Sequence, residues 1–404
     1  MPAAWPPAVS PATTALPDPS PADGQLRTEF VGTPGPLFRL SLWTGFLTVL
    51  TLGLYRFWMK SRLRRWYWSS VRPGGIPLEY TGLPSEKLLG FLIAVVILAF
   101  YIGVVNLILM FLSLSLLAEN LAAYLVSFLG VIPLWFFARY RMRRYILART
   151  RWRGIRFGLL PGAWGYAVRA MGHWILTILS LGILWPRMTF GLEKYRTDRT
   201  FFGSTRLTQG GEWGMLMPHY VHALAGGILS GGFALVSLGD HPNFGWLLLV
   251  TVPWLFYGIC HYQAGATREL AATKSAAGIG LDARPRPQRV TRIYLFGTLG
   301  AVLILLVPFL AISVAILAMQ GNDALFAALP PAVWAALGAL LYFVVFLLWS
   351  TLRHVYILMP LWRHYAETLT VTGAESILPV EQRGRDGSRE AGGFAEALDV
   401  GAAI

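Results

Sequence analysis

Long apolar runs that alternate with basic, aromatic segments constrain the fold of this chain more than any other feature. A bilayer core of about 30 Å is crossed by about 20 apolar residues in a helix, and several runs are close to or beyond that length. Only 13% of the residues are charged, against about 25% in a soluble globular chain. We therefore predict a polytopic membrane protein. The runs are Phe38–Trp58, Leu88–Ala118, Leu121–Ala138, Ala167–Leu184, Tyr220–Leu238, Phe244–Cys260, Tyr294–Met319 and Pro331–Trp349.

The basic segments repeat one spacing. Arg65 precedes Arg72 by the same interval that separates Arg144 from Arg151, and each segment ends in glycine. Glycine suits a tight turn because it takes a positive φ without steric cost. We predict a repeated unit of helix, basic aromatic helix end, short extended segment with a glycine turn, and next helix. Weaker copies lie at Lys194–Arg206, Thr267–Lys274 and Trp362–Leu369.

Two kinds of connector join the apolar runs. The short connectors contain no Lys or Arg, whereas all the long connectors are net basic. Because basic loops stay in the cytoplasm, the long connectors are predicted to be cytoplasmic and the short ones to be outward tips. This gives three transmembrane hairpins, at 88–138, 220–260 and 294–350. The short connectors are Glu119-Asn120, Asp240–Asn243 and Gln320–Leu329; the long ones are 55–87, 139–169, 187–219 and 261–293.

Phe38–Trp58 and Ala167–Leu184 leave two alternatives open. If both span the bilayer, there are eight helices, and loop 187–219 faces opposite to loop 139–169. If both are re-entrant, six helices span and every basic loop shares one side, which satisfies the charge rule better. The predicted fold class is thus all-α, a transmembrane helix bundle with internal repeats and about eight helices, or six plus two re-entrant segments.

Three regions are expected along the chain. Residues 1–27 form a Pro- and Ala-rich tail, 28–380 the repeat-built transmembrane domain and 381–404 a second tail. The tails are predicted to be disordered, since such compositions cannot bury a core.

The strings Leu50–Trp58, Arg62–Tyr67 and Glu79-Tyr80-Thr81-Gly82 resemble the YjgN-type family of bacterial inner-membrane proteins, catalogued as domain of unknown function 898. The resemblance covers roughly 28–380. It implies a multi-pass protein of the bacterial inner membrane with unassigned activity, and it supplies no catalytic residues.

Arginines interleaved with aromatic residues are the main candidate site. Guanidinium groups bind phosphate in bidentate fashion and stack on aromatic rings, and basic clusters beside membrane helices attract anionic lipids. The same residues also serve as topology determinants. The predicted anion- or headgroup-binding residues are Arg62, Arg64, Arg65, Arg72, Arg141, Arg143, Arg144 and Arg151. Polar residues inside a bundle are often functional, which adds Asn106 and His173.

Two functions are compatible with these residues: a transporter or channel-like protein for an anionic substrate, and a non-transporting protein that binds anionic lipid headgroups. A polar path from the arginines to Asn106 or His173 would favour transport. No motif for catalysis or nucleotide binding occurs, so an enzyme is not predicted. The partners expected are anionic membrane lipids, not nucleic acid. We predict no cofactor and no metal, since His219 and His222 have no nearby acid or cysteine in sequence.

Overall fold

The computed structural model describes residues 24–100, 103–104, 107–108, 110–111, 120–239, 241–320 and 330–383. Pairs of helices alternate along the chain with pairs of short strands. The helices are α1 Pro34–Leu50, α2 Arg56–Ser70, α3 Pro84–Phe100, α5 Asn120–Ala148, α6 Ala163–Leu179, α7 Trp185–Thr197, α8 Met217–Leu238, α9 Leu248–Ala272, α10 Pro287–Gln320, α12 Pro331–Arg353 and α13 Met359–Glu367. Short helical turns are η2 Trp213–Leu216, η3 Pro242–Leu247, the π turn η4 His354–Leu358 and η5 Ala374–Ile377.

The described chain is mostly helical, as predicted, but the strands form two antiparallel sheets that the all-α class did not include. One sheet has the order β2-β1-β11-β10-β9-β8 and the other β3-β4-β5-β6-β7. The hydropathy of the sequence did not reveal the strands because each is only two to six residues long. The strands are β1 Gln25–Phe30, β2 Val71–Pro73, β3 Leu78–Tyr80, β4 Thr150–Trp152, β5 Ile155–Leu159, β6 Thr200–Phe202, β7 Thr205–Arg206, β8 Thr208–Gln209, β9 Lys274–Ala276, β10 Ile279–Ala283 and β11 Leu369–Thr372.

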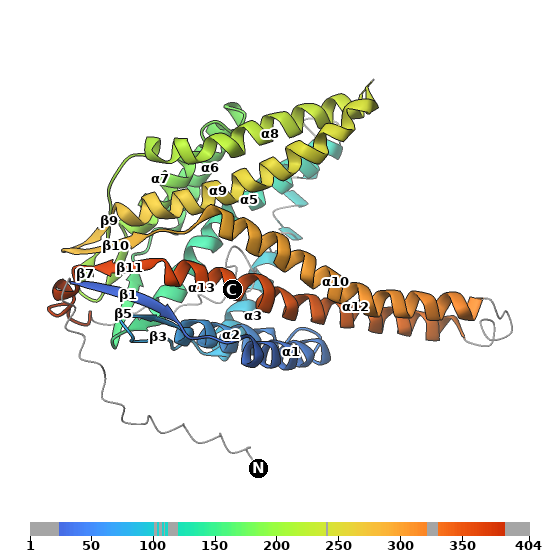
Figure 1. Ribbon diagram of the computed structural model, residues 1–404, viewed down its shortest axis with the longest axis horizontal. Coiled ribbons are helices and arrows are strands. Elements are labelled where there is room, and N and C mark those ends of the chain that lie inside the picture. The colour runs from blue at the N-terminus through green and yellow to red at the C-terminus, as the bar shows by residue number, and fades with distance from the viewer. Residues whose placement is uncertain are drawn as a thin grey trace, which may run out of the picture.

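The strands gather at one end of the molecule, and the helices extend from them (Figure 1). We call two successive helices and the strands that follow them a unit, and the chain contains five. β1 pairs with β11, the strand that follows the last helices, and so supplies the second strand of the fifth unit. Each second strand then pairs with the first strand of the next unit: β3 with β4, β5 with β6, β8 with β9, β10 with β11 and β1 with β2.

This pairing bears on the two predicted topologies. β5 belongs to connector 139–169 and β6 to connector 187–219, yet Phe157 and Phe202 are register partners in one sheet. The two connectors therefore meet at the same end of the molecule, which favours the re-entrant alternative over eight spans that would put them on opposite sides. This agrees with the charge of the connectors, whereas run length favoured eight spans.

Phe38–Trp58 and Ala167–Leu184 each contain a helix end and a reversal of the chain. At the first, Leu52 and Gly53 have φ of 50° and 91°; at the second, Leu181 and Gly182 have φ of 50° and 89°. In both turns the glycine N–H bonds to a carbonyl five residues back, at 2.7 and 2.8 Å, as in a Schellman C-cap. Both leucines are more than four-fifths exposed at the turn, although the transfer of a leucine side chain out of water is favourable.

One apolar core lies between the two sheets. It includes Leu26 from β1, Trp152 from β4, Phe202 from β6 and Val371 from β11. The chain also joins the edge strands of the sheets, β2 to β3 and β7 to β8. The strands of all five units therefore enclose a shared core.

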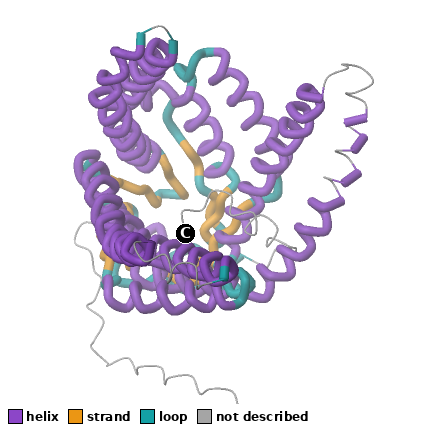
Figure 2. Tube along the Cα trace, turned by 90° about the vertical axis from the view of Figure 1, so that its right-hand side faces the viewer, coloured by secondary structure: helices purple, strands orange, loops and turns teal. Residues whose placement is uncertain are grey.

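The helical pairs are distributed around the strands when the molecule is viewed along the helices (Figure 2). Helices of neighbouring units pack against each other, so the units are held together by apolar contacts as well as by strands. These contacts include Phe57 of α2 with Phe91 of α3, Tyr140 of α5 with Tyr166 of α6, Phe190 of α7 with Tyr262 of α9, Cys260 of α9 with Val290 of α10, and Leu347 of α12 with Gly45 of α1.

Within the described residues, four helical segments are long and apolar enough to cross a membrane. They are Trp213–Leu238, Pro242–Ala272, Pro287–Leu310 and Ala332–Glu367. These match the predicted hairpins at 220–260 and 294–350. The tip of the third predicted hairpin, 88–138, lies largely outside the described residues, as do most of both predicted tails.

The shared side of the connectors can be tested with single cysteines in a Cys260→Ala background. Ser69 and Ser204 are both exposed. Ser69 lies just before β2 of one sheet, and Ser204 lies between β6 and β7 of the other. We expect Ser69→Cys and Ser204→Cys to react with an impermeant maleimide from the same face of membrane vesicles. Reaction from opposite faces would contradict the sheet pairing described above.

Candidate anion-binding site

Several of the predicted arginines bond to groups within the protein. Arg64 is buried and donates from Nη1 to the hydroxyl of Tyr80 at 3.2 Å. Arg65 donates from Nη2 to the carbonyl of Gly82 at 3.0 Å, and Arg144 donates from Nε to the carbonyl of Leu159 at 3.1 Å. The contacts of these three side chains indicate that they fix the ends of strands.

The bonds of Arg65 and Arg144 belong to a recurring arrangement. Lys194 donates to the carbonyl of Gln209 at 2.6 Å, and Arg363 donates to that of Gly32 at 2.8 Å. In all four cases a cation in the last helix of a unit bonds to a backbone carbonyl. That carbonyl lies at or just after the end of the second strand of the same unit. A bond to a charged donor contributes about 1.5–3 kcal/mol, so this arrangement accounts for part of the basic pattern in the sequence.

Arg143 belongs to an ionic network that joins three units. Its Nη2 lies 3.6 Å from the carboxylate of Glu193, which also contacts Arg196 at 2.6 Å and Lys274 at 3.0 Å. Burial alone would raise the pKa of Glu193, but the charges of Arg196, Arg143 and Lys274 hold that pKa far below its ordinary value. The carboxylate therefore stays ionised, and it neutralises part of a basic cluster between α5, α7 and β9.

The remaining predicted arginines lie apart from one another. Arg62 stands 5.9 Å from the ring centre of Tyr55, and Arg141 stands 5.7 Å from that of Phe137. Arg72 lies opposite Glu29 in one sheet, whereas Arg151 lies opposite Glu79 in the other. The eight residues are thus spread over two helices and two sheets, and their predicted role in binding anions stays a prediction.

The two predicted intramembrane polar residues give little support to a polar path. Asn106 lies outside the described residues. His173 of α6 packs against Gly191 of α7, where an added methyl group would lie 2.7 Å from its Nε2. This contact is typical of helix packing.

A cluster of histidines lies between α8 and α9. The rings of His222 and His219 lie 5.3 and 5.7 Å from that of His261, and His219 Nε2 is 3.3 Å from Glu269 Oε1. Among the described residues, no group of three or more His, Cys, Asp or Glu is arranged to hold a metal ion. The cluster is a packing contact between α8 and α9.

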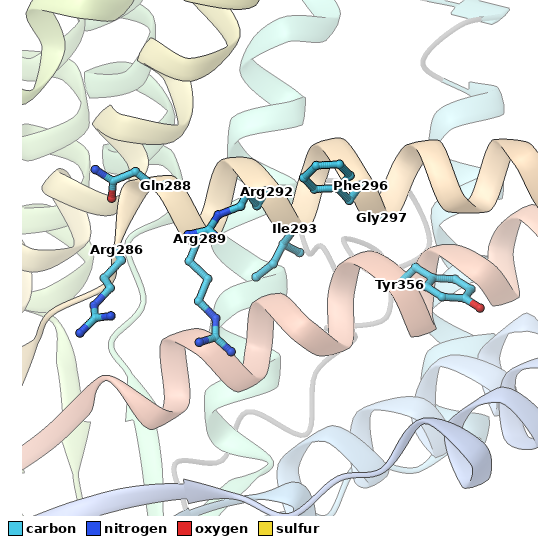
Figure 3. A pocket seen from close by; sticks show the side chains of 8 residues that line it. All are labelled: Arg286, Gln288, Arg289, Arg292, Ile293, Phe296, Gly297 and Tyr356. Atoms are coloured by element: carbon cyan, nitrogen blue, oxygen red, sulfur yellow. The ribbon is translucent and has the colours of Figure 1, made fainter.

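A different set of arginines lines a pocket of about 480 Å³ where α10 begins. Its lining combines charge and apolar surface: Arg286, Gln288, Arg289, Arg292, Ile293, Phe296, Gly297 and Tyr356. Figure 3 shows Arg286, which lies just before α10, and Arg289 of α10 extending towards the helix that carries Tyr356, whereas Gln288 points the other way. No acidic side chain lines the pocket.

The local sequence explains how these arginines come together. Arg286 ends an extended segment, where its backbone N–H donates to Nε2 of the buried His364 at 2.9 Å. α10 then begins at Pro287, a residue favoured at the first helical position. Arg289 and Arg292 follow at intervals of three residues, which places them on neighbouring parts of one helix face.

The electrostatic surroundings suit an anion. Arg286, Arg289 and Arg292 are exposed, and none of them forms an ion pair with a carboxylate in the described part of the chain. They also stand at the amino end of a 34-residue helix, where the helix dipole favours negative charge. Unlike Arg65 or Arg144, these side chains are available to a ligand.

Sequence reasoning missed this pocket. It gave most weight to the repeated interval between arginines, which the strand-end bonds explain. The signal that could have found it is Arg-Pro-Arg-Pro-Gln-Arg-Val-Thr-Arg at 284–292. Here Pro287 marks the start of a helix, and the three pocket arginines Arg286, Arg289 and Arg292 lie around that start without an acid among them.

The four apolar helical segments indicate the class of helical membrane proteins, here with two small β-sheets at one end of the molecule. The chain belongs to the family described as bacterial proteins of unknown function (DUF898), whose model matches residues 25–296. The predicted resemblance is thereby confirmed, over a shorter range than 28–380. No curated protein and no solved structure matches the chain.

The Glu193 network predicts a large effect on stability. Replacing Glu193 with Gln leaves three cations without their anion, and breaking a buried ion pair costs about 3–5 kcal/mol. We expect the melting temperature of the detergent-solubilised protein to fall by several degrees, measured by intrinsic fluorescence. Glu212→Gln, at an exposed position, should leave it unchanged.

The pH dependence of that effect follows from the lowered pKa of Glu193. Stability from a carboxylate with a depressed folded-state pKa is fully present above the unfolded value of about 4.3. It is lost only as the pH falls through the folded-state value. The difference between wild type and Glu193→Gln should therefore be the same at pH 6 and pH 8; a difference that vanishes at pH 6 would contradict the network.

Proposed function

We propose that this is a multi-pass protein of the bacterial inner membrane that binds an anionic, phosphate-bearing ligand in the pocket at the start of α10. The observation that carries the proposal is a pocket with three exposed arginines and no acidic lining residue. The function is one of binding rather than catalysis.

The proposed membrane arrangement follows from the sheets and the connectors. All four basic connectors contribute strands to the sheets at one end of the molecule, so the charge rule puts that end in the cytoplasm. We propose that the α1–α2 and α6–α7 pairs are re-entrant and insert their exposed leucine tips into the bilayer. The matched turns at Leu52-Gly53 and Leu181-Gly182 support an origin of the units by duplication.

Transport of an anionic substrate was the other expectation. It requires a polar path from the basic side into the helices, and among the described residues His173 does not line the α10 pocket. The pocket therefore supports binding, and a flux assay in liposomes loaded with a phosphorylated solute would test transport separately.

Removing the charges of the pocket should weaken binding. Basic residues near an anionic membrane contribute about 1 kcal/mol each, so Arg289→Gln with Arg292→Gln should lower affinity for phosphatidylglycerol liposomes by roughly 30-fold. Flotation of the purified protein, inserted in nanodiscs, with and without anionic liposomes would measure this. The double variant should keep the wild-type melting temperature, because these side chains form no ion pairs within the described residues.

A matched control removes two arginines with internal partners. Arg65→Gln with Arg144→Gln deletes the same amount of charge but breaks bonds to Gly82 and Leu159. This variant should lose thermal stability and keep most of its lipid affinity. Equal loss of affinity in both double variants would show that only total charge matters, and would refute a site at α10.

A further inference from the structure

We propose that the occupant of the α10 pocket is a single anionic phospholipid, with its phosphate against the arginines and the first part of an acyl chain along α10. This inference rests on the anion binding proposed above and adds the class of ligand. It distinguishes a stoichiometric lipid site from general attraction of a basic surface to the membrane.

The pocket lining changes from basic to apolar along one face of α10. Arg286, Arg289, Ile293 and Phe296 follow one another at intervals of three or four residues, the spacing of a single helix face, and Gly297 lies four residues after Ile293. Arg289 and Phe296 are about two turns, or about 10 Å, apart along the axis. A small phosphorylated solute would use only the arginine part, whereas a glycerophospholipid has a charged headgroup and an apolar chain at that separation.

The apolar part of the pocket lies at the depth of lipid chains. Pro287–Leu310 is long and apolar enough to cross the membrane, and its arginines end at Arg292. Beyond that point, Phe296 is 61% exposed and its neighbours Leu295 and Leu299 are also exposed. In a bilayer these side chains contact lipid, so the pocket opens to the headgroup region above and to the acyl region beside it.

The floor of the pocket is set by a close contact between helices. A methyl group added at Gly297 would collide with the carbonyl oxygen of Tyr356 and lie 3.0 Å from Cγ1 of Ile357. Tyr356 and Ile357 belong to the π turn η4, and π turns are frequent at functional sites. The turn presents Tyr356, 42% exposed, to the pocket wall, and tyrosine is favoured at headgroup depth.

The experiment compares lipid and soluble ligand on the same full-length protein. Delipidated protein in a neutral detergent is titrated with dioleoyl phosphatidylglycerol, dioleoyl phosphatidylcholine and glycerol 3-phosphate, and bound molecules are counted by native mass spectrometry. We expect one phosphatidylglycerol per chain to survive detergent removal. Glycerol 3-phosphate should bind at least about 100-fold more weakly, because it lacks the chain that the apolar part of the pocket would hold.

Variants separate the two parts of the pocket. Phe296→Gln should weaken phosphatidylglycerol binding about tenfold and leave the weak binding of glycerol 3-phosphate unchanged. Phe296→Leu should retain lipid binding. Phe309→Gln, at another exposed phenylalanine further along α10, controls for the loss of a lipid-facing ring and should have no effect on the bound lipid.

The possible failures are distinguishable. If glycerol 3-phosphate binds as tightly as phosphatidylglycerol and Phe296→Gln changes neither, the site takes a soluble anion: the lipid inference is wrong and the proposed function stands. If Phe296→Gln and Phe309→Gln weaken lipid binding equally, the lipid is merely part of the surrounding layer, which also refutes the inference. If Arg289→Gln with Arg292→Gln changes no binding at all, the proposed function itself fails.

Discussion

Hydrogen bonding between strands of successive units is the interaction on which the rest of this structure depends. Each strand is too short to be stable by itself. Pairing the second strand of one unit with the first strand of the next supplies directional bonds that add to the apolar contacts between the helices of neighbouring units. β1 completes the series, because it pairs with both β11 and β2. The first strand of the chain thus links the last unit to the first.

The basic residues perform two physically different tasks. Arg65, Arg144, Lys194 and Arg363 bond to carbonyls at strand ends, where a backbone oxygen would otherwise lack a partner, and leaving such a group buried and unpaired costs about 1–3 kcal/mol. Their long side chains cross from a helix to a strand and fix the angle between them. The arginines at the start of α10 make no such bond within the described part of the chain. The basic residues of this chain therefore include a set with structural partners and a set on which the proposed binding site rests.

The sequence allowed the membrane class, the hairpins at 220–260 and 294–350 and the glycine turns between short extended segments to be predicted. It did not predict the sheets, since partners such as Phe157 and Phe202 lie in different connectors and pairing across units leaves no local pattern. Apolar composition alone also does not distinguish a span from a reversal of the chain such as the one at Leu52-Gly53. The α10 pocket was missed because its wall comes from Tyr356, about 60 residues away from Phe296 in sequence.

The position of the pocket follows from the same difference between arginines that bond to groups of the protein and arginines that, within the described residues, do not. α6 also carries an arginine in its first turns, Arg169, but that side chain bonds to the carbonyl of Gly165 and stacks on Tyr195 at 4.8 Å. At α10 the neighbouring surface is the π turn, where close contact at Gly297 leaves no room for a side chain. The arginines one and two turns earlier consequently face an open space whose aromatic lining is Phe296 and Tyr356. A ligand with its own negative charge and apolar chain would complete that surface in the way that Tyr195 and Gly165 complete the one beside Arg169.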